Sequence, residues 1–510
     1  MVEKSGFDTK KYLVVQVKKI LTRVSMFEKL YLEFGGKLCF DNHASRVLPG
    51  FEVDTKVQML RSLGEIEIVH CISAKDIEGR KIRRDFGLAY DDQIIKDIND
   101  LLDRGLKVSA VVINRFSGEP SAKKLKKKLQ NRGIRVFVHY EIPNYLKDLD
   151  FVVSDGGYGR QEYVSTEKKI VVVTAPGPGS GKMSFCMAQV YNDRKYGINS
   201  GFAKFETFPI WDLPLNHPVN VAYESATADI GDYNLEDPFH KEAYGTTVVS
   251  YNRDVENFTI LRKIIEKITN KNDPLLKYKS STDMGVNMAK AGIIDDAVVC
   301  KASKQEILRR YFRYHMEFVE GDTMHDTLER MEKIMKKVNV TPEDRSVVLP
   351  ARKAGEDARR RKDEGKGYRG VFCGAAIEID TWGKVIITGK NSSMLHAESA
   401  AILNSVKTIA DIKDEIDVIS RDVIESMIQL KRKMGLSSTS LDVKEVLVAL
   451  AASAVIDENA RKCRDMLGKL KGCEMHTTHL LDNGDERLLE QLGLNVTTDA
   501  KLPYPNADNK

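Results

Sequence analysis

The sequence predicts an α/β protein in three parts: a mostly parallel sheet covered by helices in three layers, a helical middle domain and an α+β C-terminal domain. Between residues 65 and 173, short apolar runs alternate with amphipathic stretches, which is the pattern of a parallel sheet with helices on both faces. Beyond residue 255 the apolar spacing becomes helical, and two hairpin-like runs follow residue 371. We therefore expect domains over residues 1–254, 255–345 and 346–510.

Five apolar runs of the first domain are expected to be buried strands: residues 66–72, 108–113, 134–139, 151–154 and 170–173. Helical spacing of isoleucine and leucine predicts helices over residues 92–104 and 121–132, and Gly105 and Gly133 stand where helix C-caps belong. The second helix carries a run of lysines at 123–128. Because its leucines would face the sheet, we expect these lysines to form a solvated outer face.

The segment that is most informative about chemical function joins the last of these expected strands to an expected helix. Residues 169–174 run into a turn rich in glycine and proline, and a helix is expected over residues 185–191. Backbone N–H groups, the positive end of a helix and a lysine would meet at one point, which favours a bound phosphate. Lys182 is also the expected catalytic group of this turn. The candidate binding residues are Gly177, Gly179, Ser180, Gly181, Lys182 and Ser184.

The turn matches the P-loop pattern G-x-x-x-x-G-K-[ST] only in part. Gly181 and Lys182 fit, but Pro176 stands where the first glycine belongs, and Met183 replaces the hydroxyl residue that would hold Mg²⁺. Ser184 comes one residue late and could serve as that ligand only if the helix begins one residue later. The sequence therefore supports phosphate binding more directly than ATP hydrolysis, and the alternative is an ordinary Gly/Pro turn.

Two carboxylates are candidates for holding Mg²⁺ beside such a turn. Asp155 follows the expected strand 151–154, and Glu224 follows a short expected strand over residues 219–223. Either could act as the acidic residue of a Walker B-like site. An acidic residue at a strand end also suits a helix cap or a loop, and proximity to Lys182 decides between these interpretations.

The middle of the chain is expected to be mainly helical. Residues 202–229, rich in aromatics and prolines, suit a rigid loop or lid. Helical spacing predicts helices over residues 257–269 and 304–338, in which a methionine stripe fills the core. Residues 351–370 are rich in Arg, Lys, Asp, Glu and Gly, and are expected to form an exposed linker or mobile loop.

A second Gly-Lys segment follows the hairpin expected over residues 371–380 and 385–388. Residues 388–393 would lead into a Ser-capped helix over residues 394–406, so a strand, a turn and a helix start meet again. A histidine in its first turn could act as acid or base near neutral pH. A plain capped helix with a surface histidine is the alternative. The candidates here are Lys390 and His396 as catalytic groups for a second substrate, and Ser392 and Ser393 as binding groups.

Cys473, His476 and His479 combine thiolate and imidazole, which are the usual ligands of zinc. Their spacing differs from that of the common zinc fingers, and residues three apart in an extended segment point to opposite faces. We therefore expect core and edge residues here and do not expect zinc. A metal-dependent hydrolase built on these three side chains is the third function that we weigh, and the chain lacks His-Glu-x-x-His.

Composition narrows the class of protein. The chain of 510 residues has 79 basic and 74 acidic residues, a net charge of +5, which gives no general reason to expect nucleic acid or an anionic membrane as partner. Its seven cysteines lie far apart without Cys-x-x-Cys and are expected to be reduced thiols. The N-terminus lacks a signal-peptide core, and the longest apolar run, residues 446–456, is too short to cross a bilayer. We expect a cytoplasmic protein, and a helical insertion between two α/β parts favours a homo-oligomer.

Several stretches together resemble one family: residues 202–229, the turn around Gly179 to Lys182, residues 386–401 and residues 472–499. They are similar to the bacterial proteins grouped as domain of unknown function 1846, and the resemblance extends over nearly the whole chain. It implies a cytoplasmic bacterial protein with an α/β N-terminal domain, a helical insertion and an α+β C-terminal domain. It carries over no catalytic residue.

These patterns lead to one main hypothesis about function. It is an enzyme that binds a nucleotide or another small phosphorylated molecule at residues 177–184, uses ATP and Mg²⁺, and catalyses phosphoryl transfer or ATP-driven ligation. The alternative from another class is a metabolite-binding or scaffold protein that holds a phosphorylated ligand without turning it over, and Pro176 and Met183 favour it. Magnesium dependence would discriminate between the two.

Overall fold

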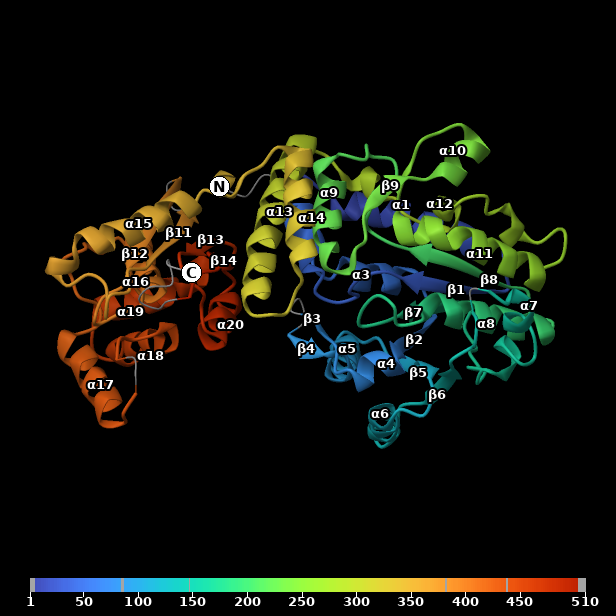
Figure 1. Ribbon diagram of the computed structural model, residues 1–510, viewed down its shortest axis with the longest axis horizontal. Coiled ribbons are helices and arrows are strands. Elements are labelled where there is room, and N and C mark those ends of the chain that lie inside the picture. The colour runs from blue at the N-terminus through green and yellow to red at the C-terminus, as the bar shows by residue number, and fades with distance from the viewer. Residues whose placement is uncertain (1–4, 84–86, 146, 381–382, 437–438, 503–510) are drawn as a thin grey trace. The chain divides into compact units, whose positions relative to one another are not determined.

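The computed structural model describes residues 5–83, 87–145, 147–380, 383–436 and 439–502. The chain forms two compact units, Met1–Glu306 and Ile307–Lys510, each with its own sheet (Figure 1). The boundary falls inside the segment expected as a separate helical domain over residues 255–345. Within the described ranges, no helix combines the length and apolar character needed to span a bilayer.

The first unit is built on six parallel strands in the order β6-β5-β2-β7-β1-β8. Four of the five expected strands are confirmed, and two strands that the apolar pattern missed complete the sheet. The six are β1 (Lys29–Phe34), β2 (Ile66–Ser73), β5 (Val108–Phe116), β6 (Val136–Tyr140), β7 (Ile170–Thr174) and β8 (Ser200–Phe205). Two small antiparallel pairs stand apart from it: β3 (Ile82–Arg83) with β4 (Leu88–Ala89), and β9 (Asn234–Glu236) with β10 (Val249–Tyr251).

Helices of this unit lie on both sides of the strands (Figure 1). They are α1 (Thr9–Val24), α2 (Asn42–Val47), α3 (Thr55–Ser62), α4 (Ala74–Glu78), α5 (Tyr90–Asp103), α6 (Pro120–Gln130), α7 (Leu149–Val152), α8 (Lys182–Lys195), α9 (Pro218–Ser225), α10 (Pro238–Tyr244), α11 (Asn252–Ile268) and α12 (Ser281–Met284). A further helix, α13 (Asp296–Val319), begins in this unit and ends in the second.

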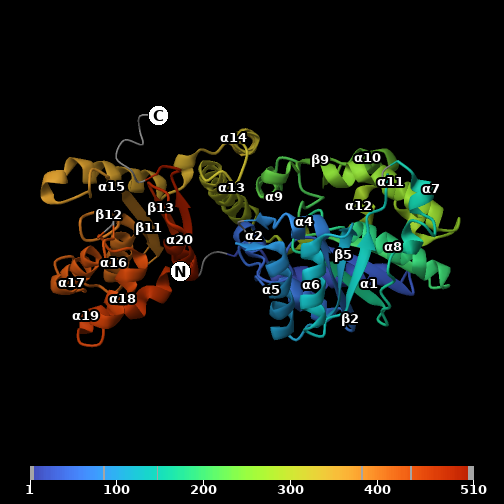
Figure 2. The same ribbon diagram turned by 60° about the horizontal axis from the view of Figure 1, so that its bottom comes forward.

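The helices α5 and α6 lie against the sheet beside β5 (Figure 2), as their apolar spacing predicts. Gly105 and Gly133 follow them with φ of 72° and 76°, the left-handed conformation of a helix C-cap. On α6, Leu125 and Leu129 are buried, whereas Lys123, Lys124, Lys127 and Lys128 are exposed. The lysine run is therefore a solvated helix face.

Two short apolar runs expected as strands are helical. Residues 151–154 overlap α7, where Asp148 accepts a hydrogen bond from the Phe151 N–H at 3.0 Å. Residues 219–223 lie in α9, which starts with Pro218 in its first turn and is capped by His217. Both runs are too short for their apolar periodicity to distinguish a strand from a helix. The residues that cap the helices, Asp148 and His217, favour the helical conformation. The segment 202–229, expected as a loop or lid, thus contains the end of β8 and all of α9.

The second unit has a four-stranded sheet in the order β12-β11-β13-β14. Its strands are β11 (Gly374–Asp380), β12 (Lys384–Lys390), β13 (Glu474–Thr477) and β14 (Asn495–Thr498). The expected hairpin is confirmed as β11 and β12, and β13 pairs antiparallel to β11 and parallel to β14. The helices are α14 (His325–Val338), α15 (Val348–Arg360), α16 (Ala397–Ile409), α17 (Arg421–Lys433), α18 (Val443–Ser453), α19 (Glu458–Met466) and α20 (Asn483–Gln491).

Alternate residues of β11 serve two cores, with α15 and α16 on opposite sides of the sheet (Figure 2). Ile377 and Ile379 point into the larger core of α16 to α20, and Ala376 packs with Ala351 of α15. A Cβ atom on Gly374 would lie 2.2 Å from the carbonyl oxygen of Ala351, so glycine allows α15 to approach the strand closely. The expected exposed linker over residues 351–370 is therefore wrong in its first half, which is a packed helix.

Candidate functional site

The turn rich in glycine and proline, residues 175–181, lies at the carboxyl edge of the parallel sheet. It follows β7, which pairs with β2 on one side and β1 on the other. The chain leaves β1, builds β2, β5 and β6 to one side, and then returns to insert β7 between β1 and β2. This change of direction is where open parallel sheets bind ligands, because the loops on either side diverge there.

The turn is held in a definite conformation by its own residues and by β5. Gly179 and Gly181 have φ of 77° and 82°, which side chains other than glycine rarely adopt. The Asn114 amide donates a hydrogen bond to the Ser180 carbonyl at 2.8 Å, and the Ser180 hydroxyl donates to the Gly177 carbonyl at 2.8 Å. A Cβ atom on Gly177 would lie 2.1 Å from the Tyr90 hydroxyl, so packing alone requires glycine there.

The backbone N–H groups of this turn have no backbone acceptor among the described residues. Helix α8 begins at Lys182, three residues before the expected start, with Gly181 at the N-cap position. In the part of the chain that the structure describes, no N–H from Gly179 to Ser184 donates to a backbone carbonyl. The first turn of α8 therefore presents donors and the positive end of its dipole at the sheet edge.

Lys182 lies beside a carboxylate that the sequence did not single out. Its Nζ stands 3.8 Å from Oε1 of Glu33 at the end of β1, and the two side chains are 13% and 9% exposed. Ser184, the expected metal ligand, lies near Tyr145, whose pKa is raised by burial and lowered in smaller measure by the Ser184 hydroxyl. The phenol of Tyr145 in turn lies 2.6 Å from that of Tyr158. Among the contacts above, Glu33 is the acidic residue that lies beside Lys182.

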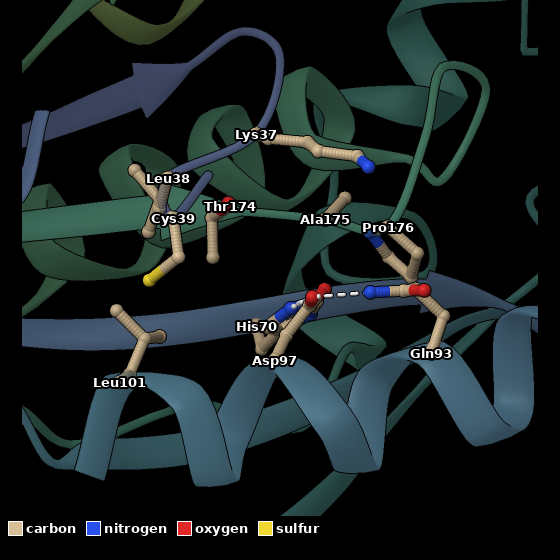
Figure 3. A pocket seen from close by; sticks show the side chains of 10 residues that line it. All are labelled: Lys37, Leu38, Cys39, His70, Gln93, Asp97, Leu101, Thr174, Ala175 and Pro176. Carbon is tan, nitrogen blue, oxygen red and sulfur yellow. Dashed lines mark hydrogen bonds and ion pairs between the residues drawn. The ribbon is translucent and has the colours of Figure 1, made fainter. Parts of the chain in front are cut away.

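A small cavity adjoins the start of the turn (Figure 3). It has about 20 Å³ open to the centres of water molecules, which is room for one or two waters. Figure 3 shows Lys37 of the loop after β1 on one side of it, and His70 of β2 beside Asp97 of α5 on the other. The ten residues that line it are Lys37, Leu38, Cys39, His70, Gln93, Asp97, Leu101, Thr174, Ala175 and Pro176.

His70 is held in one orientation by its neighbours. Its Nε2 lies 3.2 Å from Oδ2 of Asp97, and the Gln93 amide donates to the other oxygen of Asp97 at 2.6 Å. The His70 side chain is 1% exposed, and its Nδ1 has no hydrogen-bond partner among the described residues. A buried ring nitrogen without a partner suits a water or ligand atom in the cavity.

A second group of charges lies at the carboxyl ends of β1 and β8. Glu33 and Lys204 are register partners on the two strands, and Lys204 Nζ lies 2.6 Å from Asp254 and 3.0 Å from Glu206. Burial, with the negative charge of Asp254, raises the pKa of Glu206 to about 7 although Lys204 opposes this. Tyr251 donates a hydrogen bond to Glu206. The sheet edge thus carries several buried ionisable groups, which is typical of functional sites.

The two expected magnesium ligands do not lie at strand ends beside the turn. Asp155 contacts Lys195 and the Tyr191 hydroxyl, the latter at 3.0 Å, near the C-terminal end of α8. Lys182 begins the same helix, which is 14 residues long, so Asp155 stands at the end of α8 away from Lys182, about 20 Å along its axis. Glu224 is buried within α9.

The second Gly-Lys segment has a different structure from the first. Residues 388–390 belong to β12, and Lys390 lies 3.6 Å from Asp357 of α15. A Cβ atom on Gly389 would lie 2.2 Å from the Ala397 carbonyl oxygen, so this glycine serves the packing of α16 against β12. The helix begins at Ala397 with His396 at the N-cap position, later than expected.

The serines of this segment form a turn before the helix. The Ser392 hydroxyl oxygen accepts from the N–H groups of Met394 and Leu395, each at 3.2 Å, and Ser393 is exposed. His396 Nδ1 lies 3.1 Å from Oε1 of Glu398. Burial lowers the pKa of His396, but the hydrogen bond and charge of Glu398 outweigh burial and raise it. Lys182 and His396 belong to different units.

Cys473, His476 and His479 have separate partners. The Cys473 thiol donates to the Lys469 carbonyl at 3.6 Å, and His476 Nδ1 lies 2.9 Å from the Thr497 hydroxyl. His479 Nε2 lies 3.4 Å from Oε2 of Glu398. The described residues include two groups with metal-ligand geometry, and neither contains this trio. All seven cysteines are free thiols.

Comparison with known proteins identifies the family. The family model described as domain of unknown function DUF1846, N-terminal, matches residues 5–339, and its C-terminal counterpart matches residues 343–507. A UPF0371 protein of Clostridium tetani is 47% identical over 502 residues, covering 98% of each chain. UPF0371 proteins of Clostridioides difficile and Fusobacterium nucleatum are each 46% identical over 505 residues, covering 99% of each chain. The chain therefore belongs to the DUF1846 family, whose bacterial members include these UPF0371 proteins.

Proposed function

We propose that the first unit binds a small phosphorylated molecule at the carboxyl edge of its parallel sheet, with residues 177–184 holding the phosphate. Phosphoryl transfer or ATP-driven ligation is the reaction class that we favour. The observation that carries this proposal is the position of the turn after β7, the strand between β1 and β2, where the N–H groups of two left-handed glycines and of the first turn of α8 have no backbone acceptor among the described residues. Such donors at a helix start attract phosphate oxygens.

Lys182 supports the proposal through its position. At 3.8 Å from Glu33 it forms a loose ion pair, and a phosphate at the start of α8 would offer it a doubly charged alternative partner. Charge-assisted hydrogen bonds of this kind contribute about 1.5–3 kcal/mol, which corresponds to roughly 10- to 100-fold in affinity. In this arrangement Glu33 takes the place expected for Asp155 or Glu224 as the acidic group beside the phosphate.

The cavity beside Pro176 would accept a small part of the ligand. It admits only one or two waters, so the phosphate itself lies outside it, over the turn. His70, oriented by Asp97 and with Nδ1 unpartnered among the described residues, would supply a proton acceptor or donor there. The sequence alone does not single out this pair, because a histidine inside an apolar strand is usually a core residue.

A second candidate function is ligand binding without turnover. Ser184 lies near Tyr145, and Met183 occupies the position of the usual magnesium ligand. With Asp155 at the opposite end of α8, two of the expected metal contacts are directed elsewhere. These observations favour a phosphate-binding protein whose affinity does not depend on Mg²⁺. The seven free thiols support a reducing compartment such as the cytoplasm for either function.

A thermal-shift titration of the full chain tests the proposal. ATP, ADP, pyrophosphate and inorganic phosphate are each added with and without Mg²⁺, since a ligand that binds only the native state raises its stability by about 2.7 kcal/mol at 100 times Kd. The variants are Lys182→Ala and, as matched control, Lys195→Ala at the other end of α8, where the lysine contacts Asp155.

We expect a shift with at least one phosphate compound, its loss in Lys182→Ala and its retention in Lys195→Ala. A shift that requires Mg²⁺ would support phosphoryl transfer or ligation, and one that is independent of Mg²⁺ would support binding without turnover. The absence of a shift with all four compounds, or equal shifts in wild type and Lys182→Ala, would show that residues 177–184 are only a structural turn.

A further inference from the structure

Three metal-ligating side chains converge in the second unit, at the start of α16. His396 precedes the helix, Glu398 lies in its first turn, and Asp485 lies in the first turn of α20. Each offers one ligand atom, and these atoms all lie within 4.8 Å of one another. His396 Nδ1 and Glu398 Oε1 are separated by 3.1 Å.

A second observation is that one carboxylate oxygen of this cluster is buried without a hydrogen bond among the described residues. Glu398 is 1% exposed, and its Oε2 has no hydrogen-bond partner among the described residues. His479 Nε2 approaches Oε2 only to 3.4 Å, and its own Nδ1 is also buried and unpartnered within the described ranges. A buried carboxylate is normally satisfied by hydrogen bonds, by an ion pair or by a metal.

The fold brings the three groups together from the starts of two helices, α16 and α20. The His396 N–H donates to the Leu441 carbonyl at 3.0 Å, and the Val443 N–H donates to Asp485 at 3.1 Å. Gly389 allows α16 to pack directly on β12 and so sets the position of Glu398. Ligands held by different elements in this way are preorganised for an ion.

We infer that His396, Glu398 and Asp485 form a binding site for a divalent first-row transition ion, with His479 contacting Glu398 from outside the coordination sphere. Ligands about 2.1 Å from a shared ion stand roughly 3.4 Å apart in a tetrahedral arrangement, close to the 3.1 Å between His396 Nδ1 and Glu398 Oε1. An imidazole combined with two carboxylates suits Zn²⁺ or Mn²⁺ better than Ca²⁺ or Mg²⁺.

The site is open to further ligands, because three protein ligands leave at least one coordination position of zinc for water or substrate. It also disfavours an anion at the start of α16, since Glu398 and Asp485 carry negative charge there. This differs from the role in acid–base chemistry on a phosphorylated substrate that the sequence suggests for His396. The inference is independent of the phosphate site of the first unit.

Metal titration of the full chain tests the inference. Protein stripped with chelator is titrated with Zn²⁺ by calorimetry and with Mn²⁺ by electron paramagnetic resonance. The variants are His396→Ala and Asp485→Asn, and Asn keeps an oxygen that can accept from the Val443 N–H. The control is His217→Ala in the other candidate group, where His217 Nε2 lies 3.0 Å from Asp296 and 3.6 Å from the Cys300 thiol.

We expect one ion per wild-type chain with at least one of the two metals, and a loss of roughly 100-fold in affinity in either site variant. His217→Ala should bind like wild type. Circular dichroism without metal checks that each variant is folded. The inference is overturned if the wild-type chain binds neither ion, if both folded site variants bind like wild type, or if His217→Ala alone abolishes binding.

Discussion

The conformation of the turn at residues 177–184 can be tested by adding one methyl group at two nearby positions. Gly179 and Gly181 have nearly the same φ, 77° and 82°, so alanine costs about 1–2 kcal/mol at either position through backbone strain. The two differ in their surroundings. A Cβ atom on Gly179 meets no atom within 4 Å, whereas one on Gly181 lies 2.9 Å from both Cβ and Nδ2 of Asn114.

Asn114 cannot move aside easily. It is 3% exposed, and its amide donates to the Ser180 carbonyl. Overpacking of this kind costs about 1–3 kcal/mol, which adds to the strain. We therefore expect Gly179→Ala to lose about 1–2 kcal/mol and Gly181→Ala to lose about 2–5 kcal/mol. At roughly 2 °C per kcal/mol for a unit of this size, the two melting temperatures should fall by about 2–4 °C and 4–10 °C.

Differential scanning calorimetry of the full chain measures both melting temperatures. It separates the unfolding transition of the first unit from that of the second where the two occur at different temperatures. Circular dichroism at 25 °C confirms that both variants are folded. Equal losses of stability in the two variants would refute the reasoning, since they would show that Asn114 does not press against residue 181. A larger loss in Gly179→Ala would contradict it more strongly.

Three further substitutions test the packing and charges of the two units. Gly389→Ala should destabilise the second unit by several kcal/mol, because its Cβ would lie 2.2 Å from backbone of α16, whereas Gly468→Ala, with nothing within 4 Å, should be nearly neutral in urea unfolding. Arg345→Met should cost about 3–5 kcal/mol in the same assay, because the fully buried guanidinium pairs with Glu474; a neutral effect would contradict this. Glu206 has a pKa raised to about 7, so its contribution to stability is present below its ordinary pKa and is lost as pH rises through 7. Glu206→Gln should therefore raise the melting temperature relative to wild type at pH 8 and not at pH 5, and a pH-independent difference would count against the assignment.

The sequence predicts the strands and helices that have an unbroken apolar pattern, and it misses those that carry charge. β1 and β8 contain Glu33 and Lys204, which would be costly in a buried strand if each stood alone. They are register partners at the carboxyl ends of adjacent strands, and each has an oppositely charged partner there: Lys182 for Glu33, and Glu206 with Asp254 for Lys204. A single sequence does not show which charged residues meet in the folded chain. Glu33 and Lys204 therefore made both strands, and the part of the candidate site that they form, difficult to predict.

The charged segment at residues 351–360 shows a different limit. Arginine and lysine suggest an exposed linker, but Ala351, Ala354, Gly355 and Ala358 share one helix face and are buried against the sheet. Their spacing of three and four residues was a readable signal. Alanine and glycine contribute little to an apolar pattern, however, and the close approach of α15 to Gly374 becomes evident only in three dimensions.

The candidate site was predictable where it depends on local sequence. The turn after β7 and the helix that follows it are expected from a strand, glycines and a lysine in order, although α8 begins at Lys182, three residues before the expected start. The acidic partner did not follow: Asp155 and Glu224 were assigned to strand ends that are helical, whereas Glu33 lies on a strand distant in sequence. Likewise, His396 was recognised alone, and Asp485 joins it only through the packing of α20.

The most direct test of the phosphate site is a crystal structure of the full chain grown with pyrophosphate. We predict phosphate oxygens within hydrogen-bonding distance of the N–H groups of Gly179 to Lys182, with the Lys182 ammonium moved from Glu33 towards the ligand. Pyrophosphate bound elsewhere while these N–H groups contact only water, or a turn that remains free of ligand at saturating pyrophosphate, would contradict the account.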